Sequence, residues 1–204
     1  MVREIANKDV IIPAANLHSM VRDARGRTLN LVADLNEHQF TIPCIEAVNP
    51  LAWELGHIAY FYEVFLLRLL DGTAPILEEV DKLYDSFLLD HDDRWSLQLP
   101  SRKKTLEYMR DVMDLVLGRL DTKEPTAEET YLYQLCVHHE DMHGEAFTQM
   151  RQSLEYPEPR VETMNTDSVI KELGGGALPG DVRIPGGQFQ LGAHRTAPFV
   201  FDNE

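Results

Sequence analysis

Two histidines one helical turn apart are the clearest chemical signal in this sequence. His139 and His143 lie on a stripe of mostly apolar residues that recurs every three or four positions. Side chains at positions i and i+4 of a helix point the same way, so the two imidazoles can reach a single metal ion. The alternative is a buried pair that is satisfied by hydrogen bonds to neighbours. Two unpaired polar rings in a core are costly, which favours the metal-binding interpretation.

His57 is the best candidate for a third metal ligand. It lies in the middle of the most apolar helical segment, on a stripe with Trp53, Phe61 and Val64. The alternative is a single core histidine held by a hydrogen bond. His138 lies about 100° around the helix from the stripe and receives no ligand role. Four histidines near helix ends or in loops also receive no role, namely His18, His38, His91 and His194.

The segment from His139 to His143 also matches H-E-x-x-H, the signature of zinc proteases. In that alternative, Glu140 is the general base of a zinc hydrolase. Three fixed letters in five residues make a weak motif, and we predict no strands beside this helix to bind a peptide. A metal-free helical interaction module is a further alternative, but it leaves the histidine pair unexplained.

Four segments with helical periodicity are expected to position these histidines. Their ranges are Leu17–Leu35, Leu51–Leu70, Leu106–Leu120 and residues 126–155. The second segment has Asn49 as a candidate N-cap, Pro50 at the first helical position and Gly72 at its end. The fourth opens with a capping box formed by Thr126 and Glu129. We therefore predict an all-α protein, folded as an up-down four-helix bundle.

The pattern changes after the fourth helix. Prolines and a run of three glycines indicate a linker over residues 157–181. The segments 182–191 and 198–201 have strand-like composition, but two short strands cannot form a sheet alone. The predicted organisation is a metal-binding bundle over residues 1–156, the linker, and the first strands of an incomplete second domain over residues 182–204.

The composition favours a soluble protein of the cytoplasm. The net charge of −15 and the pI of about 4.9 argue against nucleic acid or an anionic membrane as a partner. The segment Met1 to Lys8 has no apolar stretch that would indicate a signal peptide, and no apolar run approaches the roughly 20 residues of a membrane span. The two cysteines, Cys44 and Cys136, fit a reducing compartment.

Two motifs surround the candidate ligands, namely Asn49-Pro50-Leu51-Ala52-Trp53-Glu54-Leu55-Gly56-His57 and His139-Glu140-x-x-His143-x-Glu145. Together with the tail, they resemble one enzyme family, the iron(II)-dependent sulfoxide synthases, which include the ergothioneine, ovothiol and selenoneine synthases. The first resembles the ligand-bearing helix of the family's DinB-type bundle, and the second resembles its H-x-x-x-H-x-E helix. The tail, with Ile184-Pro185-Gly186-Gly187 and Phe199-Val200-Phe201-Asp202-Asn203-Glu204, resembles the start of the family's second domain, which is similar to formylglycine-generating enzyme.

This resemblance implies a domain of an enzyme that joins sulfur or selenium to the imidazole of hercynine, a trimethylated histidine. It implies that His57, His139 and His143 bind Fe(2+), and that the substrates are hercynine, a selenosugar or thiol donor, and dioxygen. Most groups that hold hercynine, and the catalytic tyrosine, come from the family's second domain, so we expect this chain alone to be inactive. DinB-type bundles also host zinc or nickel thiol transferases and isomerases, which remain an alternative.

Six further residues are candidates for the surroundings of the metal. Glu54, Glu140 and Glu145 are close enough to a ligand in sequence to orient an imidazole N–H, and the alternative for each is a solvated glutamate. The candidates for substrate binding are Arg94, Asp141 and Met142.

The segment between the second and third helices bears on the sulfur or selenium donor. From residue 73 to residue 100, Arg94 is accompanied by seven acidic residues. A γ-glutamylcysteine donor carries two carboxylates, which are normally held by bidentate arginines. The segments Leu83–Ser86, Asp93–Trp95 and Glu140–Phe147 look most like selenoneine synthase. We therefore expect a neutral selenosugar donor.

Overall fold

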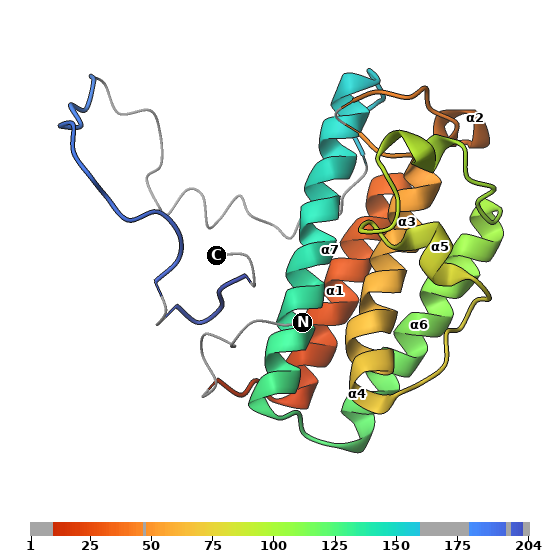
Figure 1. Ribbon diagram of the computed structural model, residues 1–204, viewed down its shortest axis with the longest axis horizontal. Helices are drawn as coiled ribbons and strands as arrows, with labels where there is room; N and C mark the ends of the chain where they lie inside the picture. Colours follow the sequence, from red (N-terminus) through yellow and green to blue (C-terminus); the bar gives the residue numbers. More distant parts are fainter. Residues whose placement is uncertain (1–9, 47, 160–179, 195–196, 202–204) are drawn as a thin grey trace.

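The computed structural model describes residues 10–46, 48–159, 180–194 and 197–201 of the 204-residue chain (Figure 1). All regular elements in these ranges are helical. In chain order they are α1 Ala14–Val32, α2 Glu37–Phe40, α3 Leu51–Tyr62, the π-helix η1 Glu63–Arg68, α4 Leu69–Asp71, α5 Val80–Tyr84, the 3₁₀-helix η2 Asp92–Trp95, α6 Arg102–Thr122 and α7 Ala127–Ser153. The prediction of an all-α protein is confirmed for the described residues.

Four long helical segments lie side by side: α1, the continuous run α3–η1–α4, α6, and α7 (Figure 1). The segments α1 and α7 are parallel, because Arg151 near the end of α7 donates to the Leu31 carbonyl near the end of α1 at 2.9 Å. The run α3–α4 and α6 are also parallel, because Asp71 at the end of α4 pairs with Arg119 near the end of α6 at 2.6 Å. The two pairs run in opposite directions.

The prediction of a simple up-down alternation is therefore wrong for the second and third long segments, which run the same way. The reason is the connection between them, residues 72–101, which contains α5 and η2. A connection of this length can return to the opposite end of a helix before the next helix begins, as long crossovers do in other helical bundles.

The segment α3 is the most enclosed helix, as its composition predicted. Ten of its 12 residues are buried. It belongs to one hydrophobic core with large side chains from several parts of the helical body, including Trp53, Tyr62, Tyr84, Tyr108, Tyr133 and Phe147, each nearly inaccessible to solvent. Burial on this scale is the main source of stability for a protein of this size.

The ends of the helices partly follow the sequence signals. The capping box of α7 is confirmed, because Thr126 accepts from the Glu129 amide and Glu129 accepts from the Thr126 amide. Gly72 ends α4 in the left-handed conformation with φ 66°, as predicted. At the start of α3, however, Pro50 occupies the N-cap position and no side chain caps the helix. The Asn49 side chain is used elsewhere, as described below.

A π-helical stretch interrupts the second long segment and was not predicted. It begins at Glu63, whose buried carboxylate accepts a hydrogen bond from the Ile76 amide at 3.0 Å and from the Tyr108 hydroxyl at 2.6 Å. The wider turn brings Glu63 to these two partners on the connection and on α6. Stretches of this kind are often found next to functional sites.

The described part of the tail contains no strand, so the predicted strands at 182–191 and 198–201 are absent from it. A strand needs a neighbour to complete its hydrogen bonds, and Val182, Ile184, Phe189 and Leu191 are exposed. Most of the predicted linker, residues 160–179, lies outside the described residues. At the tail's end, the Phe199 ring packs on Tyr131 and His138 of α7 with centroid distances of 5.4 and 4.6 Å.

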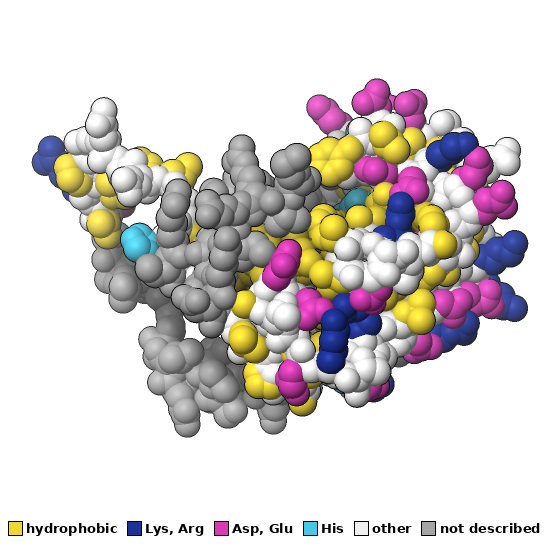
Figure 2. Space-filling model, turned by 60° about the horizontal axis from the view of Figure 1, so that its bottom comes forward, with side chains coloured by type: hydrophobic (Ala, Val, Ile, Leu, Met, Phe, Trp, Pro, Cys, Tyr) yellow, Lys and Arg dark blue, Asp and Glu magenta, His cyan; other side chains and the backbone are white. Residues whose placement is uncertain are grey.

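Acidic and basic side chains are interspersed on the face of the helical body in Figure 2. None of the described helices combines the length and apolarity needed to cross a membrane.

Candidate metal centre

The fold brings the three predicted metal ligands together. His57 comes from α3, and His139 and His143 come from the antiparallel neighbour α7. One ring nitrogen from each histidine lies within 4.8 Å of the other two. The Nε2 atoms of His139 and His143 are 3.2 Å apart.

His57 is held by its Nδ1 atom, which donates a hydrogen bond to the Tyr84 carbonyl at 2.7 Å. A carbonyl can only accept, so the proton of the neutral ring is on Nδ1 and the lone pair is on Nε2. The ring is also stacked on Trp53, with a centroid distance of 4.6 Å and an interplanar angle of 11°. Tyr84 ends α5, and its buried ring packs where a side chain at Gly56 would otherwise lie.

His143 is held by a carboxylate. Its Nδ1 atom donates to Oε2 of Glu54, and the other oxygen of Glu54 accepts from the Asn49 amide nitrogen at 2.6 Å. Glu54 is 1% exposed. Burial alone would raise the pKa of Glu54, but the hydrogen bonds from His143 and Asn49 outweigh it and lower the pKa. Glu54 therefore stays ionised, and a carboxylate on the far nitrogen makes an imidazole a better metal ligand.

His139 is held by ring stacking. It lies on Phe61 with a centroid distance of 3.6 Å and an interplanar angle of 9°. Its Nδ1 atom is buried and has no hydrogen-bond partner among the described residues. Burial and the neighbouring histidines lower the pKa of His139 well below its usual value, and burial followed by the charge of His143 lowers the pKa of His57 to about 4. Both rings are neutral at pH 7, which is the form that binds metal ions.

The geometry of the three rings fits a divalent metal. Histidine nitrogens bind such ions at about 2.1 Å, so two adjacent ligands lie roughly 3 Å apart, close to the separation of the two Nε2 atoms on α7. Without an ion, the same spacing allows one of these two nitrogens to donate a hydrogen bond to the other. A set of three imidazoles suits iron, zinc, copper or nickel and leaves positions open for other ligands.

A cavity of about 400 Å³ lies beside the histidines. It is lined by residues of α3, η1, α7, the connection after α5, and the tail, namely His57, Tyr60, Phe61, Val64, Phe65, Asp85, Ser86, Phe87, Leu135, His139, Met142 and Phe201. Aromatic rings dominate this lining, and Asp85 supplies a carboxylate. A metal held by the histidines would lie at the wall of this cavity.

Comparison with known protein families decides the family of the chain. The model of the DinB superfamily matches residues 20–147, a range that includes all three histidines. The chain belongs to the DinB superfamily.

Three curated proteins similar to this DinB chain bear the same name. The hercynine oxygenase of Mycolicibacterium smegmatis is 33% identical over 189 residues, which cover 89% of this chain and 42% of that protein. The hercynine oxygenase of Mycolicibacterium thermoresistibile is 34% identical over 137 residues, covering 66% of this chain and 30% of that protein. The hercynine oxygenase of Mycobacterium tuberculosis is 31% identical over 128 residues, which cover 62% of this chain and 30% of that protein. The chain thus spans less than half the length of these relatives.

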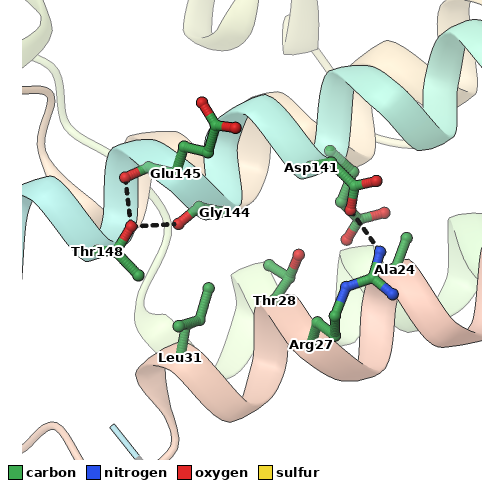
Figure 3. Close-up of a pocket in the computed structure, with 9 residues that line it drawn as sticks. Ala24, Arg27, Thr28, Leu31, Asp141, Gly144, Glu145 and Thr148 are labelled. Carbon is green, nitrogen blue, oxygen red and sulfur yellow. Dashed lines mark hydrogen bonds and ion pairs between the residues drawn. The ribbon is translucent and has the colours of Figure 1, made fainter. Parts of the chain in front are cut away.

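The other acidic residues predicted for the site lie away from the three imidazole rings. Glu140 is fully buried, but its carboxylate accepts from Arg25 of α1 at 2.7 Å. Asp141 pairs with Arg27 across the groove between α1 and α7, and Glu145 lines the same groove (Figure 3). Of the three glutamates, Glu54 is the one bonded to an imidazole.

The candidates for substrate binding are also separated. Met142 is half-exposed and lines the cavity beside the histidines, whereas Asp141 lines the groove on the other side of α7. Arg94 lies outside the lining of the cavity. Its guanidinium covers the Trp53 ring at 4.1 Å and donates to the Asn49 side-chain oxygen at 2.5 Å.

Three residues that hold the histidines were missed as site residues in the sequence: Asn49, Phe61 and Tyr84. Asn49 had been interpreted as a helix cap, and Phe61 only as a member of the apolar stripe. Phe61 lies four residues after His57 on the same helix face, and this spacing was available as a signal. No sequence signal pointed to the Tyr84 carbonyl, because every residue type carries a backbone acceptor.

Proposed function

We propose that this chain is the metal-binding domain of a non-heme iron(II) enzyme that modifies the imidazole of hercynine. In this proposal His57, His139 and His143 hold the iron, and the residues 182–204 begin a second domain similar to formylglycine-generating enzyme. The four packed helical segments then form the DinB-like four-helix bundle of such an enzyme. When bound, iron would supply open coordination positions and one-electron chemistry with dioxygen.

One observation carries the proposal: three imidazole nitrogens converge within 4.8 Å in a chain that is similar to a hercynine oxygenase over 89% of its length. Two of the three rings are oriented by hydrogen bonds on their far nitrogens, which is the usual arrangement around metal ligands. The protein's own residues thus fix ring orientation and keep the lone pairs directed at one point.

The test is metal binding by the chain under anaerobic conditions. We expect the wild type to retain about one Fe(2+) per chain after reconstitution and gel filtration. His57→Ala, His139→Ala and His143→Ala should each lower the affinity by orders of magnitude, because each removes one of three ligands. Metal content by elemental analysis, together with helicity by circular dichroism, gives the readout.

The matched control is His38→Ala, which removes an exposed histidine at α2 and should leave the metal content unchanged. Equal metal content in the wild type and in His57→Ala would refute the three-histidine site. Retention of zinc or nickel in preference to iron would favour the alternative of a DinB-type thiol transferase or isomerase.

The zinc hydrolase alternative loses support from the position of Glu140. A general base must reach a metal-bound water, whereas this carboxylate is fully buried and bonded to Arg25. A metal-free interaction module would leave three imidazoles directed at one point without a ligand.

The cavity supports a neutral donor of sulfur or selenium. Among the described residues that line it there is no lysine or arginine, and Asp85 adds a negative charge. A selenosugar or thiosugar presents hydroxyls that a carboxylate can accept from, whereas γ-glutamylcysteine would bring two carboxylates and a net negative charge. We therefore propose that the complete enzyme forms a C–Se bond, as in selenoneine biosynthesis, with a C–S bond as the alternative.

A further inference from the structure

We infer that Arg94 and Asn49 are positioning residues that orient two of the three metal ligands. This inference rests on the proposed metal site and goes beyond it. Two routes lead from the Arg94 guanidinium to the histidines, one through a hydrogen-bonded relay and one through stacked rings. The first ends at His143 and the second at His57.

The relay has a single possible direction. Arg94 Nη1 donates to Asn49 Oδ1 at 2.5 Å, and Asn49 Nδ2 donates to Glu54 Oε1 at 2.6 Å. The other oxygen of Glu54 accepts from His143 Nδ1. An arginine can only donate and an ionised carboxylate can only accept, so Arg94 and Glu54 together fix which way the Asn49 amide faces. The orientation of the amide then fixes the carboxylate against His143.

The stacked route runs through Trp53. The Arg94 guanidinium lies 4.1 Å from the centre of this ring, and the indole also stacks on His57 at 4.6 Å. The indole nitrogen donates to the Leu83 carbonyl at 2.8 Å, which holds Trp53 beside the residue whose carbonyl binds His57. A guanidinium on an aromatic face adds a favourable cation–π interaction that lysine reproduces less well.

This geometry gives Arg94 a different role from that of a substrate ligand. It does not line the cavity beside the histidines, and its Nη1 donor is already used within the protein. It also supplies a positive charge near Glu54, a carboxylate that is 1% exposed. A buried carboxylate without such compensation is costly.

The experiment measures Co²⁺ affinity from the visible absorption of the bound ion, with four variants of the chain. Arg94→Met and Asn49→Leu should weaken binding about 10- to 100-fold, the effect typical of residues that orient metal ligands. Arg94→Lys should weaken it less, because it keeps the charge and one donor. Arg110→Met is the matched control, since Arg110 is exposed and pairs with Asp111 on α6, and it should bind Co²⁺ within twofold of the wild type.

The double variant with both Arg94→Met and Asn49→Leu provides a second criterion. Both changes act on the same carboxylate. The Co²⁺ affinity of the double variant should therefore be close to that of whichever single variant binds Co²⁺ more weakly. Unchanged Co²⁺ affinity in a folded Arg94→Met chain would overturn the inference. So would loss of γ-glutamylcysteine binding to the Co²⁺-loaded chain without loss of Co²⁺ affinity, because that result would make Arg94 a substrate ligand.

A measurement on the metal-free chain separates this inference from the proposed function. Failure of the wild type to bind Co²⁺ would refute the metal site itself. In that case the His143 Nδ1 proton can still be followed by NMR, because its bond to Glu54 is present without metal. We expect this proton to exchange faster with water in Arg94→Met and Asn49→Leu than in Arg110→Met. Equal exchange in all three would overturn the relay.

Discussion

At the scale of single residues, the three imidazoles are held in three different ways. His57 donates to a backbone carbonyl, His143 donates to a carboxylate, and His139 is held by stacking on Phe61. A carboxylate partner increases the basicity of its imidazole more than a carbonyl does, and stacking does not increase it. The three ligands of one metal would therefore differ in donor strength, with His143 the strongest.

The convergence of the three histidines could be predicted from the sequence, but their hydrogen-bond and stacking partners could be predicted only in part. Glu54 lies three residues before His57 and shares its helix face, whereas Glu140 follows His139 directly and lies about 100° around the helix. The three glutamate candidates were not ranked from the sequence, although this difference in spacing favours Glu54 over Glu140. The bond from His57 to Tyr84 depends on how the connection folds over α3, and a local pattern in the sequence does not contain that information.

Gly56 provides a test of the way His57 is held. A Cβ atom at this position would overlap the ring of Tyr84, which is fully buried. Gly56→Ala must therefore displace the Tyr84 ring, and we expect the shift to reach the carbonyl that accepts from His57. We expect a loss of about 1–3 kcal/mol in the free energy of unfolding, as for other overpacked cores, and weaker metal binding. Urea denaturation and Co²⁺ titration measure the two effects.

Gly118→Ala in α6 is the matched control, because a Cβ there meets no atom within 4 Å. Replacing a helical glycine by alanine in open space should stabilise the chain by up to about 1 kcal/mol. If Gly56→Ala and Gly118→Ala had the same free energy of unfolding, Tyr84 could move without loss of stability, which would contradict this prediction.

At the scale of elements, two predicted helix ends follow their local signals, whereas the predicted Asn49 cap of α3 is absent. The capping box of α7 and the glycine at the end of α4 were foreseen because capping depends on a few adjacent residues. The π-helical turn at Glu63 was not predicted, because it depends on hydrogen bonds to Ile76 and Tyr108, which are distant in the sequence. The direction of α6 was missed for the same kind of reason, since periodicity gives a helix its face but not its direction.

The capping box of α7 should make stability depend on pH. Burial alone would raise the pKa of Glu129, but Lys123, the Thr126 amide and Arg119 lower it from 4.5 to about 2. A depressed carboxyl pKa stabilises the folded state above pH 4.5, and this contribution is lost as the pH falls toward 2. Glu129→Gln keeps a side chain that can complete the cap but removes the charge.

We expect Glu129→Gln to be less stable than the wild type at pH 6 by about 1–3 kcal/mol, and the difference to shrink by about half or more at pH 3. Urea denaturation at the two pH values measures it, and subtracting the variant removes the contributions of other acidic groups. A stability difference that stays constant between pH 6 and pH 3 would contradict the depressed pKa of Glu129.

At the scale of the whole molecule, the site depends on the antiparallel contact between α3 and α7. These helices are far apart in the sequence. The apolar stripe on each helix predicts which face is buried, but it does not identify the helix that packs against that face. The resemblance of the two motifs to one family supplied that pairing in advance. The position of Arg94 could not be inferred in this way, because the connection after α5 folds back over the start of α3 through contacts with Asn49 and Trp53.

The charge of the cavity leads to a prediction about the donor. The described residues that line it include Asp85 but no lysine or arginine, and Arg94 lies outside the lining with Nη1 bonded to Asn49 and its guanidinium over Trp53. A neutral thiosugar should therefore bind the metal-loaded chain better than γ-glutamylcysteine, which carries two carboxylates. The difference should decrease at high salt, because salt screens the repulsion between exposed charges.

Titration of the Co²⁺-loaded chain with 1-thioglucose and with γ-glutamylcysteine tests this prediction, because a thiolate bound to Co²⁺ gives a charge-transfer band in the absorption spectrum. We expect the sugar to bind at least several-fold more tightly at low salt. Ser86→Lys places a positive charge on the lining of the cavity and should narrow the gap by strengthening dipeptide binding. Ser153→Lys adds the same charge at the exposed end of α7, outside that lining, and should have little effect. Tighter binding of γ-glutamylcysteine by the unmodified chain would contradict a neutral donor and favour C–S bond formation with that dipeptide.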